Sequence, residues 1–316
     1  MASAAFTVLA VETGFRLSED RPWYVRLTEE QRESQEYTVK SRRLDRLRDR
    51  EYRPLKPPGH FRILMLGDSF TYGLGVEDDA RIFPEILERR FNELKPDPRV
   101  VEYELLNAGI PMYLTGEWVE RFKSLEVTFQ PDFVVAVFFL RDGTLLGFQR
   151  NFVDPLLQEM AQWRREDLLA RWSAAWRTLY GRIRMLEISR RYIDSFHQAY
   201  FGADPLDTAE WSRARDNLRF LHRSCAETGR QFHLAVFPML FELHQRYPFA
   251  DICEEIERFG GAEGIPTFSL LPAFRNRDAS RLWVAPFDQH PNEEGHQIAA
   301  DALEAYLRPH LENAAR

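Results

Sequence analysis

Apolar positions along this chain fall into short runs, which are separated by longer stretches where apolar residues recur with a helical period. The runs Phe61–Leu66 and Phe133–Phe139 are almost continuously apolar, which is typical of parallel strands buried on both faces. Further strands are expected at Val100–Leu106, His233–Phe237 and Thr267–Leu270. The pattern therefore predicts a sheet of several strands between residues 56 and 316.

Helical spacing is clearest between the first two expected strands, where Phe83, Ile86, Leu87 and Phe91 repeat at intervals of three and four residues. Similar stretches lie between or after the other strands. Together they predict helices at Phe83–Leu94, Gly116–Thr128, Trp211–Thr228, Ala250–Phe259 and Gly295–Leu307. Because strands that alternate with helices form parallel sheets with right-handed crossovers, we expect a three-layer α/β/α domain with a central parallel sheet.

Two segments depart from this alternation. Residues 1–55 are polar and rich in arginine, and we interpret them as an N-terminal arm. Residues 151–207 hold tryptophans and tyrosines among many arginines and are expected to be helical. We interpret this second segment as an insertion over the carboxyl edge of the sheet, within a domain that spans residues 56–316. Its aromatic residues would form either an ordinary helical core or a lid or wall beside a site.

Composition narrows the class of partner. The 316 residues include 44% hydrophobic positions, enough for a sizeable core, and the formal net charge of −7 argues against nucleic acid as a partner. Basic residues concentrate in Lys40–Arg53 and Trp163–Arg191. These two segments are either solvated helix faces or surfaces that contact an anionic envelope surface or polymer.

Cys225 and Cys253 are the only cysteines, and neither stands in a spacing that binds a metal. We expect two buried free thiols, with one disulfide as the alternative if the protein is exported. Gly73 and Gly75 lack the lysine and the serine or threonine that complete a phosphate-binding loop. The sequence therefore predicts neither a metal nor another cofactor.

The candidate chemistry centres on Gly67-Asp68-Ser69, which follows directly after the first expected strand. A short strand that runs into a small-residue turn is how α/β hydrolases present a nucleophilic serine. Asp288 and His290 precede the last expected helix; an imidazole can take the proton of a serine while a carboxylate holds the ring. Because ligands bind at the carboxyl ends of parallel strands, these residues are expected to meet in one site.

Together with Asn107-Ala108-Gly109, these segments resemble the sequence blocks of the SGNH (GDSL-type) hydrolase superfamily, in its bacterial, envelope-associated, esterase-like branch. The resemblance extends over about residues 49 to 307. It implies a flavodoxin-like fold, with Ser69 as the nucleophile and His290 as the general base. It also implies an ester as the substrate.

The resemblance further implies an oxyanion site. The backbone N–H groups of Ser69 and Gly109 would donate to the developing charge, while Asn107 would tie the loop together. The family's third block usually reads Gly-x-Asn-Asp and its asparagine donates as well, but Leu140-Arg141-Asp142 stands at the equivalent place. Arg141 would donate to the oxyanion, bind a carboxylate of the substrate, or point away in a salt bridge.

A second departure concerns the acid. Asp288 lies two residues before His290, whereas the acid of the family usually lies three residues before its histidine. Either the loop bends differently here, or Asp288 orients the histidine only in part.

The N-terminus bears on localisation. Ala4–Val11 is apolar apart from Thr7, and Glu12-Thr13-Gly14-Phe15-Arg16 follows. No segment reaches the ~20 apolar residues of a membrane-spanning helix. In bacterial relatives of the family a membrane anchor often ends in a similar sequence, so this run is either the remnant of such an anchor or an ordinary buried or frayed end. The resemblance favours the cell envelope or its periplasmic face, with a cytoplasmic or otherwise soluble protein as the alternative.

Three functions agree with these residues. The first is a serine esterase that hydrolyses short acyl esters, with O-acetyl groups on a carbohydrate or small molecule as the expected substrate. The second is an O-acyltransferase that passes the same acyl group to a sugar hydroxyl. The third is a weakly active or non-catalytic glycan-binding module, which Arg141 and the short spacing of Asp288 and His290 favour and the intact pair of Ser69 and His290 opposes.

Overall fold

A computed structural model describes residues 47–48, 50, 52–144, 154–167, 169, 172–285 and 288–312. The chain divides into two compact units, an α/β unit of residues 34–143 and 209–316 and a second unit of residues 1–33 and 144–208. The apolar run Ala4–Val11 and most of the predicted N-terminal arm lie outside the described residues. The boundary that the sequence analysis placed after residue 55 stays a prediction.

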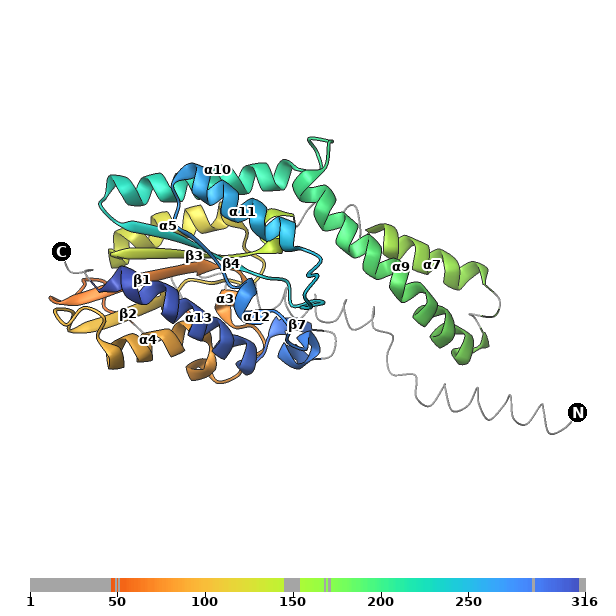
Figure 1. The fold of residues 1–316 in the computed structure, drawn as a ribbon, viewed down its shortest axis with the longest axis horizontal. Coiled ribbons are helices and arrows are strands. Elements are labelled where there is room, and N and C mark those ends of the chain that lie inside the picture. Colours follow the sequence, from red (N-terminus) through yellow and green to blue (C-terminus); the bar gives the residue numbers. More distant parts are fainter. Residues whose placement is uncertain are drawn as a thin grey trace, which may run out of the picture. The chain divides into compact units, whose positions relative to one another are not determined.

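Five parallel strands form the sheet of the α/β unit, in the order β2-β1-β3-β4-β5 (Figure 1). They are β1 (His60–Gly67), β2 (Glu102–Asn107), β3 (Phe133–Phe139), β4 (Gln231–Phe237) and β5 (Thr267–Ser269). The five predicted strands are confirmed, with ends that differ by up to two residues. This order is that of flavodoxin-like sheets, in which β1 and β3 flank the point where the strand order reverses and ligands bind at their carboxyl ends.

Helices cover both faces of the sheet (Figure 1). The first face carries α5 (Thr115–Phe129), α10 (Ala209–Glu227) and α11 (Ala250–Glu263), and the other carries α4 (Phe83–Leu94) and α13 (Glu293–Leu311). On α4, the four apolar residues singled out by their spacing are all buried. The three-layer α/β/α fold is confirmed.

Short elements connect these strands and helices. They are α3 (Ser69–Tyr72), η1 (Asp79–Arg81), η2 (Leu140–Gly143), α12 (Leu271–Phe274), η4 (Ala279–Leu282), β6 (Trp283–Ala285) and β7 (Asp288–Pro291). β6 and β7 pair as a separate antiparallel hairpin. The sequence analysis placed His290 in a loop and did not predict this hairpin, because strands of three and four residues are too short to show an alternating pattern.

The described part of the second unit is helical and consists of α7 (Asp154–Glu166) and α9 (Ala174–Phe201). Its aromatic residues pack within the unit: the Trp163 ring stacks on Tyr180, with 4.6 Å between ring centroids. The indole N–H groups of Trp163 and Trp176 both donate to Asp167 Oδ2 at 3.0 Å. These contacts favour the reading of a helical core, and the position of this unit over the sheet stays a prediction.

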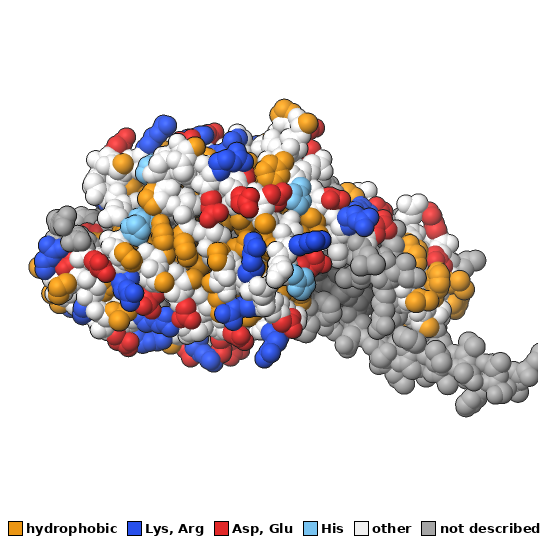
Figure 2. Space-filling view, in the orientation of Figure 1, with side chains coloured by type: hydrophobic (Ala, Val, Ile, Leu, Met, Phe, Trp, Pro, Cys, Tyr) orange, Lys and Arg blue, Asp and Glu red, His pale blue; other side chains and the backbone are white. Residues whose placement is uncertain are grey.

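The surface of the α/β unit mixes charges of both signs, as Figure 2 shows for one face. Cys225 and Cys253 are both buried and free, and burial raises the pKa of each thiol to about 12. Across the part of the chain that the structure describes, no helix has the length and apolar character needed to cross a membrane.

Candidate active site

The first feature of the site is a tight turn at the carboxyl end of β1, here called the nucleophile turn (residues 67–76). Asp68 caps the one-turn helix α3, since its Oδ1 accepts the N–H of Phe70 at 2.8 Å. The turn places Ser69 as the first residue of α3 and leaves it only 2% exposed. Gly73 closes the turn at φ 82°, in the left-handed region that glycine adopts readily.

His290 reaches the same point from β7. Its Nε2 lies 2.8 Å from Ser69 Oγ, although the two residues are 221 positions apart. Its Nδ1 is hydrogen-bonded to Asp288 Oδ1, and the same oxygen accepts the backbone N–H of His290 at 3.0 Å. A carboxylate only accepts, so Nδ1 carries the ring proton and Nε2 is the acceptor for the hydroxyl of Ser69.

The two-residue spacing of Asp288 and His290 follows from the strand. Side chains two positions apart on a strand point to the same face, so both residues of β7 can turn toward Ser69. Burial opposes ionisation of Asp288, but its hydrogen bonds with His290 and the nearby charges of His290 and Arg141 outweigh this and lower the pKa of its carboxyl. Asp288 therefore stays an ionised acceptor for the imidazole.

Aromatic rings support the histidine. The Phe70 ring lies 5.3 Å from the His290 ring, and it stacks on Phe139 with 3.9 Å between centroids. Phe237, at the end of β4, meets the edge of Phe70 at 5.1 Å. These rings exclude water from one side of the Ser69–His290 contact.

The second sequence block lies beside α3. Asn107 ends β2, and its Oδ1 accepts the N–H of Gly109 at 3.1 Å. A side chain at Gly109 would place its Cβ 2.4 Å from Tyr72 N and 2.8 Å from the carbonyl carbon of Thr71, so only glycine allows this approach. The Gly109 N–H, expected from the sequence to donate to an oxyanion, thus already donates within its own loop.

Arg141 lies in η2, directly after β3, and is half-buried. Its guanidinium carbon stands 5.7 Å from the centroid of the Phe139 ring. Burial raises the pKa of Asp68 above its ordinary value, and the charge of Arg141 opposes this rise. At Asp288 the same charge adds to the hydrogen bonds with His290, which lower the pKa against burial. Arg141 therefore acts electrostatically on the site and stands in the position that the sequence resemblance assigns to an oxyanion donor.

The sequence analysis gave little weight to Asp142, which the structure places next to these charges. Its Oδ2 accepts the N–H of Phe139 at 2.8 Å in the protein interior. Burial and the neighbouring carboxylate of Asp68 raise the pKa of Asp142 well above its ordinary value. Two buried carboxyl groups thus lie behind the nucleophile, and no spacing in the sequence reveals that they interact.

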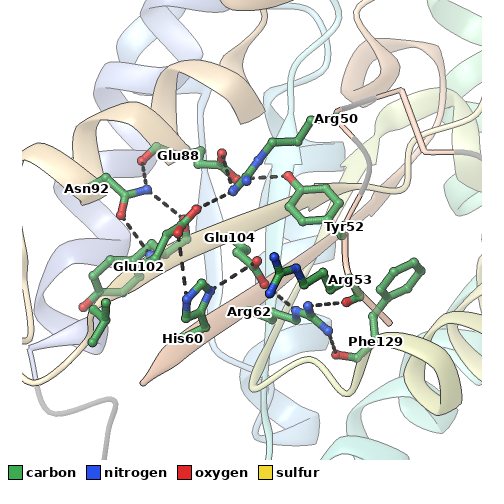
Figure 3. Close-up of polar contacts among 12 residues, drawn as sticks. Arg50, Tyr52, Arg53, His60, Arg62, Glu88, Asn92, Glu102, Glu104 and Phe129 are labelled. Carbon is green, nitrogen blue, oxygen red and sulfur yellow. Dashed lines mark hydrogen bonds and ion pairs between the residues drawn. The ribbon is translucent and has the colours of Figure 1, made fainter. Parts of the chain in front are cut away.

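One group of side chains in the described residues has the composition of a metal site: His60, Glu102 and Glu104, whose ligand atoms lie within 4.8 Å of one another (Figure 3). It stands at the amino ends of β1 and β2, away from Ser69. Glu104 pairs with the buried Arg62, and Glu102 pairs with Arg50 at 2.7 Å. Because two guanidinium groups already neutralise these carboxylates, we assign the cluster a structural role.

Comparison with known proteins finds a family match. A family model described as the GDSL-like lipase/acylhydrolase family matches residues 65–298, a stretch that contains every candidate site residue. No curated protein matches the sequence significantly.

Several solved structures are similar at low identity. A two-domain esterase active on acetylated mannans, crystallised with mannopentaose, is 14% identical with a TM-score of 0.48, and the match covers 80% of this chain and 50% of that one. The chain therefore spans about half the length of that esterase. A variant of an acetyl-xylooligosaccharide esterase from Geobacillus Stearmophilus is 15% identical with a TM-score of 0.45, over 78% of this chain and 93% of that one. A lipase/acylhydrolase from Enterococcus faecalis is 14% identical with a TM-score of 0.45, over 79% and 96% of the two chains.

Proposed function

Because this chain belongs to the GDSL-like lipase/acylhydrolase family, we propose that it is a serine esterase that hydrolyses short acyl esters through an acyl-enzyme intermediate. The observation that carries the proposal is the 2.8 Å contact between Ser69 Oγ and His290 Nε2. A hydroxyl within hydrogen-bond reach of an imidazole that is itself oriented by a carboxylate is the arrangement that activates a serine.

In the first half of the reaction, Ser69 Oγ attacks the carbonyl carbon of the ester as its proton passes to His290 Nε2. The imidazolium that forms is stabilised by Asp288, whose lowered pKa keeps it ionised. The tetrahedral intermediate collapses when the bond to the alcohol oxygen breaks and His290 returns the proton to that oxygen. The alcohol leaves, and the acyl group stays on Ser69 as an ester.

In the second half, water takes the place of the alcohol. His290 Nε2 accepts a proton from the water as its oxygen attacks the acyl carbon, and the same proton goes to Ser69 Oγ when the acyl bond breaks. The products are a carboxylic acid and the free enzyme. A sugar hydroxyl in place of water would make the same site an acyltransferase, so the acceptor decides between these two outcomes.

The oxyanion needs donors that are in place before the charge develops. We propose the N–H of Ser69, at the start of α3, as one of them. The N–H of Gly109 serves as a second only when it shares its bond with Asn107. Arg141 would supply the third donor. Its guanidinium carries a full positive charge and would replace the amide of the asparagine that the family usually has at this place.

We propose O-acetyl groups on a carbohydrate as the first substrates to test, a choice that rests on the resemblance to envelope-associated esterases. The experiment is hydrolysis of 4-nitrophenyl acetate by the wild type and by Ser69→Ala, with Ser124→Ala as a control on an exposed serine of α5. Loss of the nucleophile is expected to lower kcat by about 10⁴-fold or more, whereas the control stays near the wild type. Undiminished turnover by Ser69→Ala would contradict the proposal, and acetate release from acetylated polysaccharides then tests the substrate class.

A further inference from the structure

Arg48 lies upstream of the stretch that the family model matches, which begins at residue 65, and yet it contacts the nucleophile turn. Its Nη1 donates to Tyr72 O at 3.0 Å and to Gly73 O, and its Nη2 donates to Val76 O. Its Nε donates to Asp79 Oδ1 at 2.8 Å. We propose that Arg48 is a positioning residue, which holds the nucleophile turn so that Ser69 stays aligned with His290; this inference rests on the function proposed above.

Arg48 binds carbonyls at the end of α3 and in the residues that follow it, one of which, Gly73 O, also accepts the N–H of Val76 at 3.2 Å. The last carbonyls of a helix have no partner inside the helix and carry partial negative charge, and α3 is only four residues long. A guanidinium is planar with five donors, so one side chain can bind several carbonyls at once. The side chain of Arg48 is only 12% exposed, and its guanidinium carbon stands 4.7 Å from the centroid of the Tyr72 ring. It is therefore packed into the turn and does not lie on its surface.

A shift of these carbonyls would reach Ser69 directly. The N–H groups of Gly73 and Leu74 both donate to Ser69 O at 3.0 Å. Arg48 thus binds the far end of a segment whose near end is bonded to the nucleophile. Since misplacement of reacting groups by 1 Å can cost ~10²-fold in rate, a small displacement of this segment matters for catalysis.

The same segment touches the hairpin that carries the base. Gly75, at φ 87°, lies against Val284 of β6, because a Cβ on this glycine would stand 2.6 Å from Val284 Cγ1. β6 pairs with β7, which holds Asp288 and His290. Arg48 therefore stabilises the region where the nucleophile turn, which carries Ser69, contacts the β6–β7 hairpin, which carries His290.

Asp79, the acidic partner of Arg48, lies in a short helix that also contacts α13. It belongs to η1, and Arg81 of the same short helix pairs with Glu293 in the first turn of α13. α13 begins directly after β7, with Asn292 as its cap. The short helix η1 thus links the nucleophile turn, through Arg48, to the start of α13, through Glu293.

Arg50 provides a matched control on the same segment. It forms ion pairs with Glu102 at 2.7 Å and with Glu88 at 3.2 Å (Figure 3). Glu102 starts β2, at the opposite end of the strand from the site. Loss of Arg50 therefore removes an ion-paired arginine from the same segment but leaves the surroundings of Ser69 unchanged.

The experiment compares the wild type with Arg48→Met, Arg48→Lys and Arg50→Met. Three readouts are taken: kcat and KM for 4-nitrophenyl acetate, the rate at which diethyl 4-nitrophenyl phosphate modifies Ser69, followed by intact mass, and the midpoint of thermal unfolding. In the modification, Ser69 Oγ bonds to phosphorus, 4-nitrophenolate leaves and the serine proton passes to His290. Because the phosphate triester modifies Ser69 once and needs no later hydrolysis of an acyl-enzyme, it reports on the reactivity of Ser69 separately from acetyl turnover.

We expect Arg48→Met to lower kcat and the modification rate by about 10-fold to 100-fold with KM within about twofold of the wild type. Arg48→Lys should recover part of the loss, since an ammonium reaches one or two of the carbonyls. Arg50→Met should keep both rates within about twofold of the wild type, because its ion pairs lie away from Ser69.

Wild-type rates in a folded Arg48→Met would overturn the proposal, as would an equal loss of rate in Arg50→Met. Should the methionine variant fail to fold, the lysine variant decides alone. A wild type that reacts with the phosphate triester but hydrolyses no acetyl ester would contradict the proposed function while the comparison of Arg48 variants still stands. A wild type that reacts with neither would contradict both.

Discussion

The nucleophile and the base of this site stand on parts of the molecule that are built in different ways. Ser69 is 2% exposed, in a turn fixed between β1 of the central sheet and the loop at Gly109. Asp288 and His290 lie on the four-residue strand β7 of a small hairpin, and their side chains are 24% and 20% exposed. Burial within the fold positions the first part, whereas local hydrogen bonds and contacts with Ser69, Phe70 and Gly75 of the turn position the second.

Because of this difference, substitutions in the two parts should affect the stability of the fold and the rate of the reaction to different degrees. A change in the nucleophile turn should cost folding free energy as well as rate, because residues 67–73 of the turn are all buried. A change in the hairpin should act on the rate with little effect on stability, because its side chains are partly solvated. Four substitutions test this contrast.

Asp288→Asn tests the hairpin. The amide can present an N–H to His290 Nδ1, which favours the wrong tautomer. The substitution also removes the charge that stabilises the imidazolium, so kcat should fall by about 10³-fold to 10⁴-fold.

The same substitution should change how stability depends on pH. The lowered pKa of Asp288 stabilises the folded state at pH values above the ordinary pKa of a carboxyl group, and this contribution is lost as pH falls through the pKa of the folded state. The midpoint of unfolding near pH 7 should fall by the small contribution of this shift, and the variant should lose less stability than the wild type below about pH 4. Steady-state kinetics and thermal unfolding across pH measure both, and retention of a tenth of the wild-type kcat would contradict the assigned role.

Arg141→Ala tests the charge that acts on both parts. As an oxyanion donor, Arg141 contributes only in the transition state, so its loss should lower kcat by about 10²-fold with little change in KM. Arg141→Asn should restore part of the activity by supplying an amide donor. Kinetics on neutral and anionic esters distinguish the roles, because a rise in KM confined to anionic esters would place Arg141 in substrate binding instead.

Gly75→Ala tests the contact between the two parts, with Gly229→Ala as its matched control. Both glycines have positive φ, 87° and 72°, so each alanine should cost about 1 kcal/mol of backbone strain. Only the alanine at position 75 meets a neighbour, Val284, whereas nothing lies within 4 Å of a Cβ at position 229. We therefore expect similar losses in unfolding free energy from strain but a fall in kcat of roughly 10-fold only for Gly75→Ala. Urea unfolding and kinetics on both variants check this, and equal kinetics would show that the contact does not align the site.

Asp142→Asn tests the buried side of the nucleophile turn. Burial and Asp68 raise the pKa of Asp142, so its contribution to stability is present below the ordinary carboxyl value and is lost as pH rises through the raised one. Asparagine keeps an acceptor for the N–H of Phe139 and cannot ionise. The midpoint of thermal unfolding at pH 8 should rise by about 2–4 °C, and the difference between pH 5 and pH 8 should shrink. A lower midpoint than the wild type at pH 8 would show that the charge of Asp142 is needed, for instance to balance Arg141.

The sequence was informative wherever one local pattern decides the structure. β3 and α4 were predicted to the residue, because a continuous apolar run and a clear helical period leave few alternatives. Ser69 was found because a strand, a small residue and a serine follow one another directly. The β6–β7 hairpin was missed, since its strands are short, and this is the element that turns the unusual spacing of Asp288 and His290 into a shared face.

The sequence by itself determined the layers of the fold, the family and the residue types that do the chemistry, because hydrophobic period and short motifs are local properties of the chain. Only the tertiary structure decided the rest: that Asn107 engages the N–H of Gly109, that Arg141 acts on two carboxylates beside Ser69, and that Arg48 braces the nucleophile turn. The contacts of Arg141 and Arg48 join residues far apart in the chain, and the contact of Asn107 depends on how its loop bends. Charge and hydrogen bonding depend on the distance between atoms in space and not on their separation in sequence.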